Sequence, residues 1–165
     1  MERGLRDLSV WLWRYRENER NYPGLHFTGK AEACATLRDL VLRLAGEGGG
    51  HRTVPLRELQ PEDEAKVSGG QRFVSFAKMR LEIVPPGDEL RFMHVGYAGR
   101  AATVTVATTY TSELIAGLAD VERGRGDWAM YPPNDKASHK LLGSRDRQSV
   151  ELWFWPCFGH EQPRP

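Results

Sequence analysis

The sequence predicts an α+β fold, an antiparallel sheet with three helices packed mainly on one of its faces. Residues 72–108 have the pattern of a three-strand antiparallel meander. Helical spacing of apolar residues occurs before and after this meander, and two short apolar segments follow near the C-terminus. Because helices and strands are segregated along the chain, a doubly wound parallel sheet is disfavoured.

The first strand of the meander is predicted from alternation. Charged residues occupy the even positions from Lys78 to Glu82, and apolar residues occupy the odd positions from Met79 to Ile83. Successive side chains of a strand point to opposite faces, so one face is core and the other is at least partly in contact with solvent. The segment 85–88, PPGD, ends the strand because proline fixes φ and donates no hydrogen bond to a sheet.

The predicted register follows from pairing residue 84 with residue 89 across this loop. It places Ile83 opposite Leu90 on the apolar face and Glu82 opposite Arg91 on the other face, where opposite charges are favourable. A second turn at 98–100 contains Gly99, which tolerates the positive φ that tight hairpins need.

The pairing of residue 84 with residue 89 also assigns the side chains of the second strand to two faces, and a three-residue second turn aligns the third strand with it. His94 then faces the core beside Val104. The reverse face carries a group of apolar side chains among charged and hydroxyl residues: Phe76, Met93, Val95 and Tyr97. Such a face is too apolar for simple exposure, so these residues are predicted to bind a protein partner or a second copy in a back-to-back homodimer.

Three helices are predicted from apolar residues spaced three and four apart. The first covers residues 4–20, the second is capped by Thr28 with Cys34 on its buried stripe, and the third begins in the hydroxyl cluster at 109–112. Pro55 restricts the segment 53–59 to an edge strand.

The remaining segments are assigned by composition. Residues 60–71 are expected to form a flexible loop, 127–131 and 148–155 to form strands, and 157–165 to form a frayed tail. The segment 134–147 has no sustained periodicity and is expected to be a loop with room for one helical turn.

Length and charge limit the class of protein. A chain of 165 residues fits a single domain, 1–165. The net charge of +1 gives no overall attraction to nucleic acid, and no run of about 18 apolar residues suggests a membrane span. Two cysteines, Cys34 and Cys157, are too few for a disulfide scaffold. A cytoplasmic location, without membrane association, is therefore expected.

Catalytic chemistry has only weak candidates in this sequence. A small hydrolase or transferase would use His94 or His139 beside Asp127, because imidazole is the usual general base near neutral pH. No serine, cysteine or aspartate is placed by spacing to complete a nucleophilic unit, and the histidines show no metal-ligand spacing. No cofactor motif is present either.

Aromatic residues near the C-terminus give the best functional surface. Partly buried indoles supply contact area at low entropic cost, and such residues occur on both C-terminal strands: Trp128, Trp153 and Trp155. We therefore expect an interaction module that binds a protein partner or itself. Basic residues in the 136–147 loop leave a nucleic-acid accessory role as a weaker reading, because Asp135 and Asp146 dilute their charge and no aromatic is interleaved.

Overall fold

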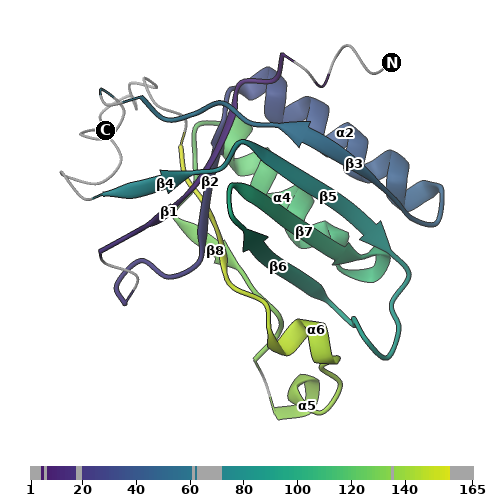
Figure 1. Cartoon of the computed structure of the whole chain (residues 1–165). Coiled ribbons are helices and arrows are strands. Elements are labelled where there is room, and N and C mark those ends of the chain that lie inside the picture. The colour runs from purple at the N-terminus through teal and green to yellow at the C-terminus, as the bar shows by residue number, and fades with distance from the viewer. Residues whose placement is uncertain are drawn as a thin grey trace.

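A computed structural model describes residues 5, 7–17, 20–60, 62, 72–134 and 136–156. The fold is α+β, as predicted, but it contains two mixed sheets instead of one antiparallel sheet. The two sheets and two long helices meet around one apolar core (Figure 1). The described part holds four α-helices, one more than predicted.

Sheet A has five strands in the order β4-β1-β2-β9-β8. Their bounds are Phe73–Ser75, Val10–Tyr15, Leu25–Gly29, Leu152–Phe154 and Trp128–Met130, respectively. β2 and β9 pair in parallel, and the other pairs are antiparallel. The C-terminal strands predicted at 127–131 and 148–155 are therefore both present.

Sheet B has four strands in the order β3-β5-β7-β6. Their bounds are Gly50–Pro55, Lys78–Val84, Ala101–Ala107 and Met93–Ala98, respectively. β3 is an edge strand, as Pro55 predicted. β5 and β7 pair in parallel, whereas β3–β5 and β6–β7 are antiparallel.

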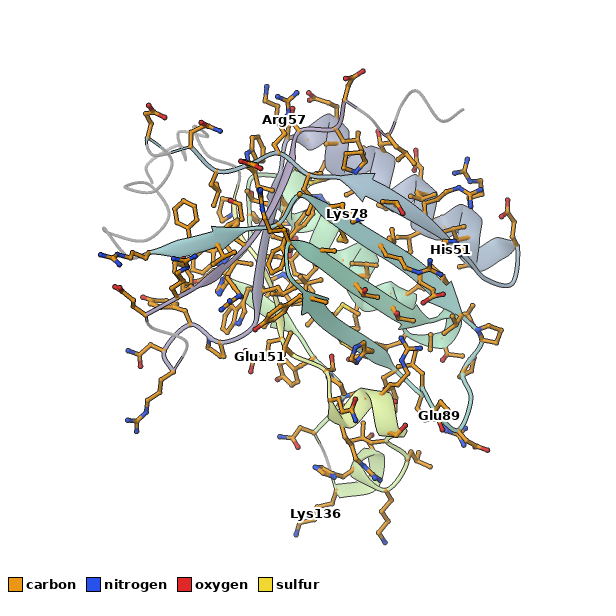
Figure 2. The ribbon with its side chains drawn as sticks, viewed as in Figure 1. His51, Arg57, Lys78, Glu89, Lys136 and Glu151 are labelled. Atoms are coloured by element: carbon orange, nitrogen blue, oxygen red, sulfur yellow. The ribbon has the colours of Figure 1, made fainter. Side chains whose placement is uncertain are left out.

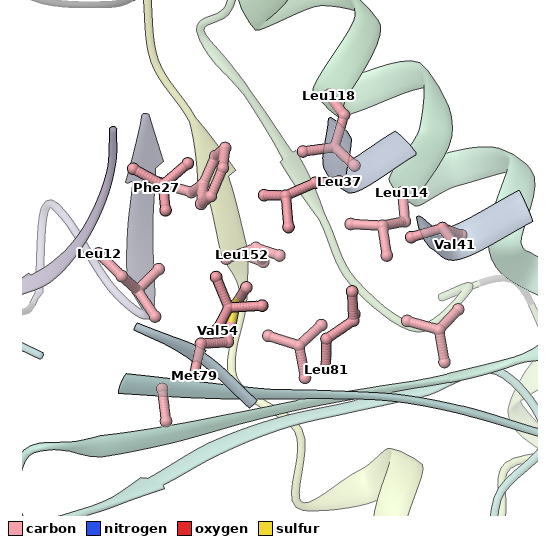
Figure 3. Close-up of a cluster of buried hydrophobic side chains, with 14 of the residues drawn as sticks. Leu12, Phe27, Leu37, Val41, Val54, Met79, Leu81, Leu114, Leu118 and Leu152 are labelled. Atoms are coloured by element: carbon pink, nitrogen blue, oxygen red, sulfur yellow. The ribbon is translucent and has the colours of Figure 1, made fainter. Parts of the chain in front are cut away.

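Helices α2 (Ala31–Gly46) and α4 (Thr111–Glu122) cover the inner face of sheet B. α4 follows a short 3-10 helix, η1 (Thr108–Tyr110). The buried stripe of α2 includes Cys34, as predicted, but the helix begins after Lys30, and Thr28 lies in β2. Leu37 and Leu114 from the helices meet Leu81 from sheet B and Phe27 from sheet A in the core (Figure 3).

The helix predicted at residues 4–20 is wrong, because residues 10–15 form strand β1. This segment is so rich in apolar residues that helical and strand periodicities both fit it. Its even positions, Val10 and Leu12, enter the main core, and its odd positions, Trp13 and Tyr15, enter a second cluster on the other side of sheet A. A strand buried on both faces, rich in Trp, Tyr and Val, explains the pattern better.

The predicted meander is also wrong in its connectivity. The segment 73–84 is interrupted after residue 75, so its first part belongs to sheet A and its second part to sheet B. β7 lies between β5 and β6, so Glu82 does not pair with Arg91 and Ile83 does not pair with Leu90. The PPGD loop reverses the chain without forming a hairpin.

The faces of β6 were assigned the wrong way round because β6 was paired with β5 across the PPGD loop, whereas among the described strands it pairs only with β7. Ala98 pairs with Ala101, so the turn between β6 and β7 has two residues instead of three. Gly99 does adopt a positive φ of 56°. A shift of one residue moves every side chain to the opposite face. Met93 and Val95 therefore face the core, and His94 faces outward.

The segment 136–148 contains two short helices, α5 (Lys136–His139) and α6 (Ser144–Arg147), where a loop with one helical turn was predicted. The predicted loop at 60–71 lies mostly outside the described residues, and the predicted tail at 157–165, with Cys157, lies wholly outside them. Among the described residues, no helix combines the length and apolar character needed to span a membrane.

Candidate functional site: the open face of sheet B

Sheet B turns one face away from the core, and we call it the open face. Both long helices pack on the opposite side, so no helix of the pair covers it (Figure 1). Its side chains alternate with the buried ones along each strand. They are His51, Thr53 and Pro55 from β3, Lys78, Arg80 and Glu82 from β5, Ala101, Thr103 and Thr105 from β7, and His94, Gly96 and Ala98 from β6. Figure 2 shows His51 and Lys78 on the side that faces the viewer.

One row of the open face crosses all four strands. His51 pairs with Glu82, Glu82 pairs with Thr105, and Thr105 pairs with His94. Because paired residues of neighbouring strands share a face, their polar side chains line up across the sheet. The charged and hydrogen-bonding groups of this surface are therefore concentrated in one line.

Glu82 is the centre of a hydrogen-bonded network in this row. Arg80 Nη2 donates to Glu82 Oε1 at 3.1 Å, and Thr105 Oγ1 donates to Glu82 Oε2 at 3.2 Å. Arg145 Nη2, from α6, donates to Thr105 Oγ1 at 3.2 Å. One carboxylate thus holds two guanidinium groups against the sheet, one directly and one through a hydroxyl.

The electrostatics of Glu82 follow from this network. Partial burial raises the pKa of the Glu82 carboxyl, but the hydrogen bonds from Arg80 and Thr105 and the charges of Arg80 and Arg145 outweigh it. The pKa of Glu82 is therefore held below its usual value, and the side chain is an anion at neutral pH. With Lys78, the cluster carries three cations and one anion.

His94 is oriented by the backbone of α6. Its Nδ1 lies 3.0 Å from the carbonyl oxygen of Arg145, and since a carbonyl only accepts, Nδ1 carries the proton. A Cβ atom at Gly96 would lie 2.9 Å from His94 Nε2, so the ring lies close over Gly96.

α6 is fastened to sheet B by a buried carboxylate. Asp146, 2% exposed, accepts backbone N–H bonds from Arg91, Phe92, Met93 and Gly143 at 2.8, 2.6, 3.0 and 3.1 Å. Val95 also donates to Ser149 Oγ and accepts from the N–H of Val150. The outer edge of β6 is therefore closed by chain that follows α6, and Arg145 is held over the open face.

The catalytic candidates do not come together in the described structure. His94 bonds to a carbonyl group, His139 is exposed on α5, and Asp127 is exposed in the loop before β8. Asp127 adopts an unusual φ of 77° and donates its backbone N–H to Phe154. Thr105, the hydroxyl nearest to His94 in register, is fully buried and donates to Glu82, so it is not available as a nucleophile.

The partner-binding candidates divide into two groups. Phe76, Met93 and Val95 are 0% exposed. The apolar sheet face predicted from them is therefore not on the surface, and it cannot form the predicted back-to-back dimer. Tyr97 is 44% exposed beneath the guanidinium of Arg14. Met93 and Val95 face the core because β6 pairs with β7 through a two-residue turn and does not pair with β5, whereas Phe76 enters the core from the connection between β4 and β5.

The three tryptophans lie in sheet A and are all half-buried. Trp128 packs on Phe154 at the main core, whereas Trp153 and Trp155 lie on the outer side of sheet A around His26. Trp155 Nε1 donates to His26 Nδ1 at 2.8 Å, and Trp153 Nε1 donates to Glu151. Whether these residues bind a partner remains a prediction.

The candidate site is the surface of a sheet, and within the described residues it is built around neither a cavity nor a metal centre. The apolar cavity beside Leu37, Leu114 and Phe154 has a volume of about 10 Å³, the size of one water molecule. No group of three or more His, Cys, Asp or Glu side chains within the described ranges is arranged to hold a metal ion. The open face is the surface of a sheet, which suits a large partner better than a small molecule.

Sequence reasoning missed the open face because it depends on the strand order. The charged alternation of β5 did identify Lys78, Arg80 and Glu82 as outward-facing. The contribution of β3, β7 and Arg145 depends on contacts between distant segments.

Comparison of the chain with protein-family models, curated proteins and solved structures finds no match.

Proposed function

We propose that the protein is a small cytoplasmic interaction module that docks an acidic surface of a partner protein on the open face. The observation that carries this proposal is the network in which Glu82 holds Arg80 and Arg145 over a sheet face that the long helices leave free. A face with ordered cations has less side-chain entropy to lose on binding.

Charge complementarity supports an acidic partner. Lys78, Arg80 and Arg145 outnumber Glu82 on this surface, so the excess charge is positive. A guanidinium has five N–H donors, and each of the two bonds described above uses one of them. Donors remain for carboxylate groups of a partner.

Carboxylates fit this arrangement better than nucleic acid. The two guanidinium groups come from different elements and are separated by the Glu82 side chain, which suits several separate monoanions on a protein surface. Among the described residues, the open face carries no Phe, Tyr or Trp side chain on which bases could stack, and its two imidazole rings, His51 and His94, lie apart on the edge strands β3 and β6.

Site-specific photocrosslinking in the native host tests the proposal. A photoreactive amino acid replaces Thr103 at the centre of the open face or, as a control, Leu42, which is 52% exposed on α2. We expect a covalent protein adduct at Thr103 and none at Leu42. The adduct should weaken with rising salt, disappear in an Arg80→Glu background, and map to an acidic surface of the captured protein.

Two outcomes contradict the proposal. One is a Leu42 adduct without a Thr103 adduct, which would place the interface on the helices. The other is the absence of any Thr103 adduct while the protein is folded and expressed at its normal level.

A further inference from the structure

The short-helix segment 136–148 carries more exposed positive charge than its sequence suggests. It contains four cations, Lys136, Lys140, Arg145 and Arg147, and one acid, Asp146. Lys136, Lys140 and Arg147 are exposed, whereas Asp146 is 2% exposed and bonded to four backbone N–H groups. Of the two acids expected to dilute this charge, Asp146 is therefore absent from the surface, and Asp135 lies outside the described residues.

The segment adjoins the open face at the His94 end of the polar row. Arg145 donates to Thr105 and its carbonyl orients His94, so α6 contacts the row directly. Lys136 lies at the far end of the segment (Figure 2). Among the described residues outside the segment, Glu89 contacts it by accepting a hydrogen bond from Ser144, whereas Asp135, which precedes Lys136, lies outside the described residues.

We propose that Lys136, Lys140 and Arg147 form a basic rim that extends the open face and steers the acidic partner onto it. This inference rests on the proposed function and deepens it by assigning separate roles to two groups of cations. The rim acts on the association rate, because exposed charges attract a partner over about a Debye length. Arg145, held by α6 against Thr105, acts on the bound complex.

Asp146 has a positioning role in this arrangement. Its four N–H bonds tie α6 to the start of β6, and Gly143 has no room for a side chain because a Cβ atom there would lie 2.3 Å from the Glu89 carbonyl oxygen. The same contacts that hide the one acid of the segment therefore also fix Arg145 over the sheet.

The test measures association rates with two probes at low salt. Poly-L-glutamate represents an acidic polypeptide, and a DNA duplex of equal charge represents nucleic acid. The rim variant carries Lys136→Gln, Lys140→Gln and Arg147→Gln. The matched control carries Lys30→Gln, Arg20→Gln and Arg123→Gln, which are also exposed, lie away from the open face, and change the net charge equally. A third variant, Lys78→Gln with Arg80→Gln, alters the open face itself.

We expect the rim variant to bind poly-L-glutamate about tenfold more slowly, and the control variant to differ from the wild type by about twofold at most. Circular dichroism should show that all variants are folded, since the replaced side chains are on the surface. Raising the salt concentration should remove most of the difference between rim and control variants.

Each other outcome decides a separate part of the inference. Equal rates for rim and control variants, with slower binding by the Lys78/Arg80 variant, overturn the rim and leave the proposed function standing. Failure of the wild type to bind poly-L-glutamate, or no effect of either the rim or the Lys78/Arg80 variant, overturns both. Tighter, rim-dependent binding of the DNA duplex than of poly-L-glutamate overturns the acidic-protein partner in favour of nucleic acid.

Discussion

His26 and His94 both lie on strands and point away from the main core, yet their surroundings are opposite. His26, on sheet A, is 0% exposed and surrounded by the rings of Trp13, Tyr15 and Trp155. His94, on sheet B, is half-buried on a polar face without aromatic neighbours in its row. The outward side of a strand is therefore not a reliable indicator of solvent exposure or of function.

The hydrogen bonds of His26 show that its role is structural. Nδ1 accepts from Trp155 Nε1–H, so Nε2 carries the proton and donates to the carbonyl of Tyr22, 3.4 Å away. Burial lowers the pKa of His26 to about 4, and the ring is neutral at pH 7. Both nitrogens are satisfied, and neither is free for chemistry. The polar row of sheet B, in contrast, has cations with donors to spare.

The largest expected loss of folding stability comes from detaching α6, the short helix that is bound to sheet B through Asp146. Replacing Asp146 by alanine leaves four backbone N–H groups without their shared acceptor, three of them at the start of β6. Since each charge-assisted bond contributes about 1.5 to 3 kcal/mol and water will replace some, we expect a loss of about 4 kcal/mol. Urea unfolding monitored by circular dichroism measures this loss.

Asp146→Asn refines that experiment. Asparagine keeps one acceptor oxygen but turns an NH₂ group toward backbone donors, so an intermediate loss is expected. If the alanine variant unfolds at the same urea concentration as the wild type, α6 is not held by this carboxylate, and the orientation of Arg145 needs another explanation.

The second prediction concerns acid stability and belongs to sheet A. In the unfolded chain His26 titrates near 6.5, whereas in the fold its pKa is about 4. Below pH 6.5 the unfolded chain binds the proton more strongly, so folding stability is complete above pH 6.5 and falls as the pH drops toward 4. The shift corresponds to a loss on the order of 3 kcal/mol at the acid end.

Thermal unfolding from pH 7 to pH 4 checks this prediction. His26→Gln keeps an acceptor for Trp155 and a donor for Tyr22 but does not titrate, so its melting temperature should fall less over the same range. Equal pH dependence of wild type and variant would assign the acid lability to other groups.

The sequence predicts features that depend on neighbouring residues, but it does not predict strand order or turn length. The stripes of α2 and α4 were correct because helical periodicity is local, and Cys34 was placed on its stripe for the same reason. The alternation of β5 correctly gave Met79 and Leu81 to the core. These assignments need only neighbouring residues.

The faces of β6 could not be predicted with the same security. Both faces of the segment 92–97 carry apolar and aromatic residues, so a two-residue and a three-residue turn fit almost equally well. Insertion of β7 between β5 and β6 depends on packing under α2 and α4, which is non-local. The open face combines both unknowns, and for this reason the sequence analysis placed the partner surface on Met93 and Val95 instead.

The third prediction uses Gly96 to test whether the His94 ring matters on the open face. A Cβ atom would come 2.9 Å from Nε2, but the ring is the end of a side chain and can move, so Gly96→Ala should cost less than about 1 kcal/mol. The ring should leave the Arg145 carbonyl, and the nitrogen chemical shifts of His94 should change toward those of a mixed tautomer. Unchanged shifts would contradict the packing of the ring over Gly96.

The smallest effect is expected at Glu82. Replacement by glutamine keeps the size of the side chain and a hydrogen bond to Thr105 but loses the charge that pairs with Arg80. The pair is partly exposed, so we expect a loss of about 0.5 to 1 kcal/mol at pH 7. The folded-state pKa of Glu82 is lowered, so its contribution is present above the usual carboxyl pKa and disappears as the pH falls through the lowered value. The difference in unfolding free energy between wild type and Glu82→Gln should therefore vanish in strong acid.

The Glu82→Gln variant should also bind poly-L-glutamate faster, since it removes the one anion of the row. It should release poly-L-glutamate faster too, because Arg80 and Arg145 lose the carboxylate that orders them. Slower association in the variant would contradict this expectation, and would mean that the order which Glu82 imposes on Arg80 and Arg145 matters more for association than its negative charge.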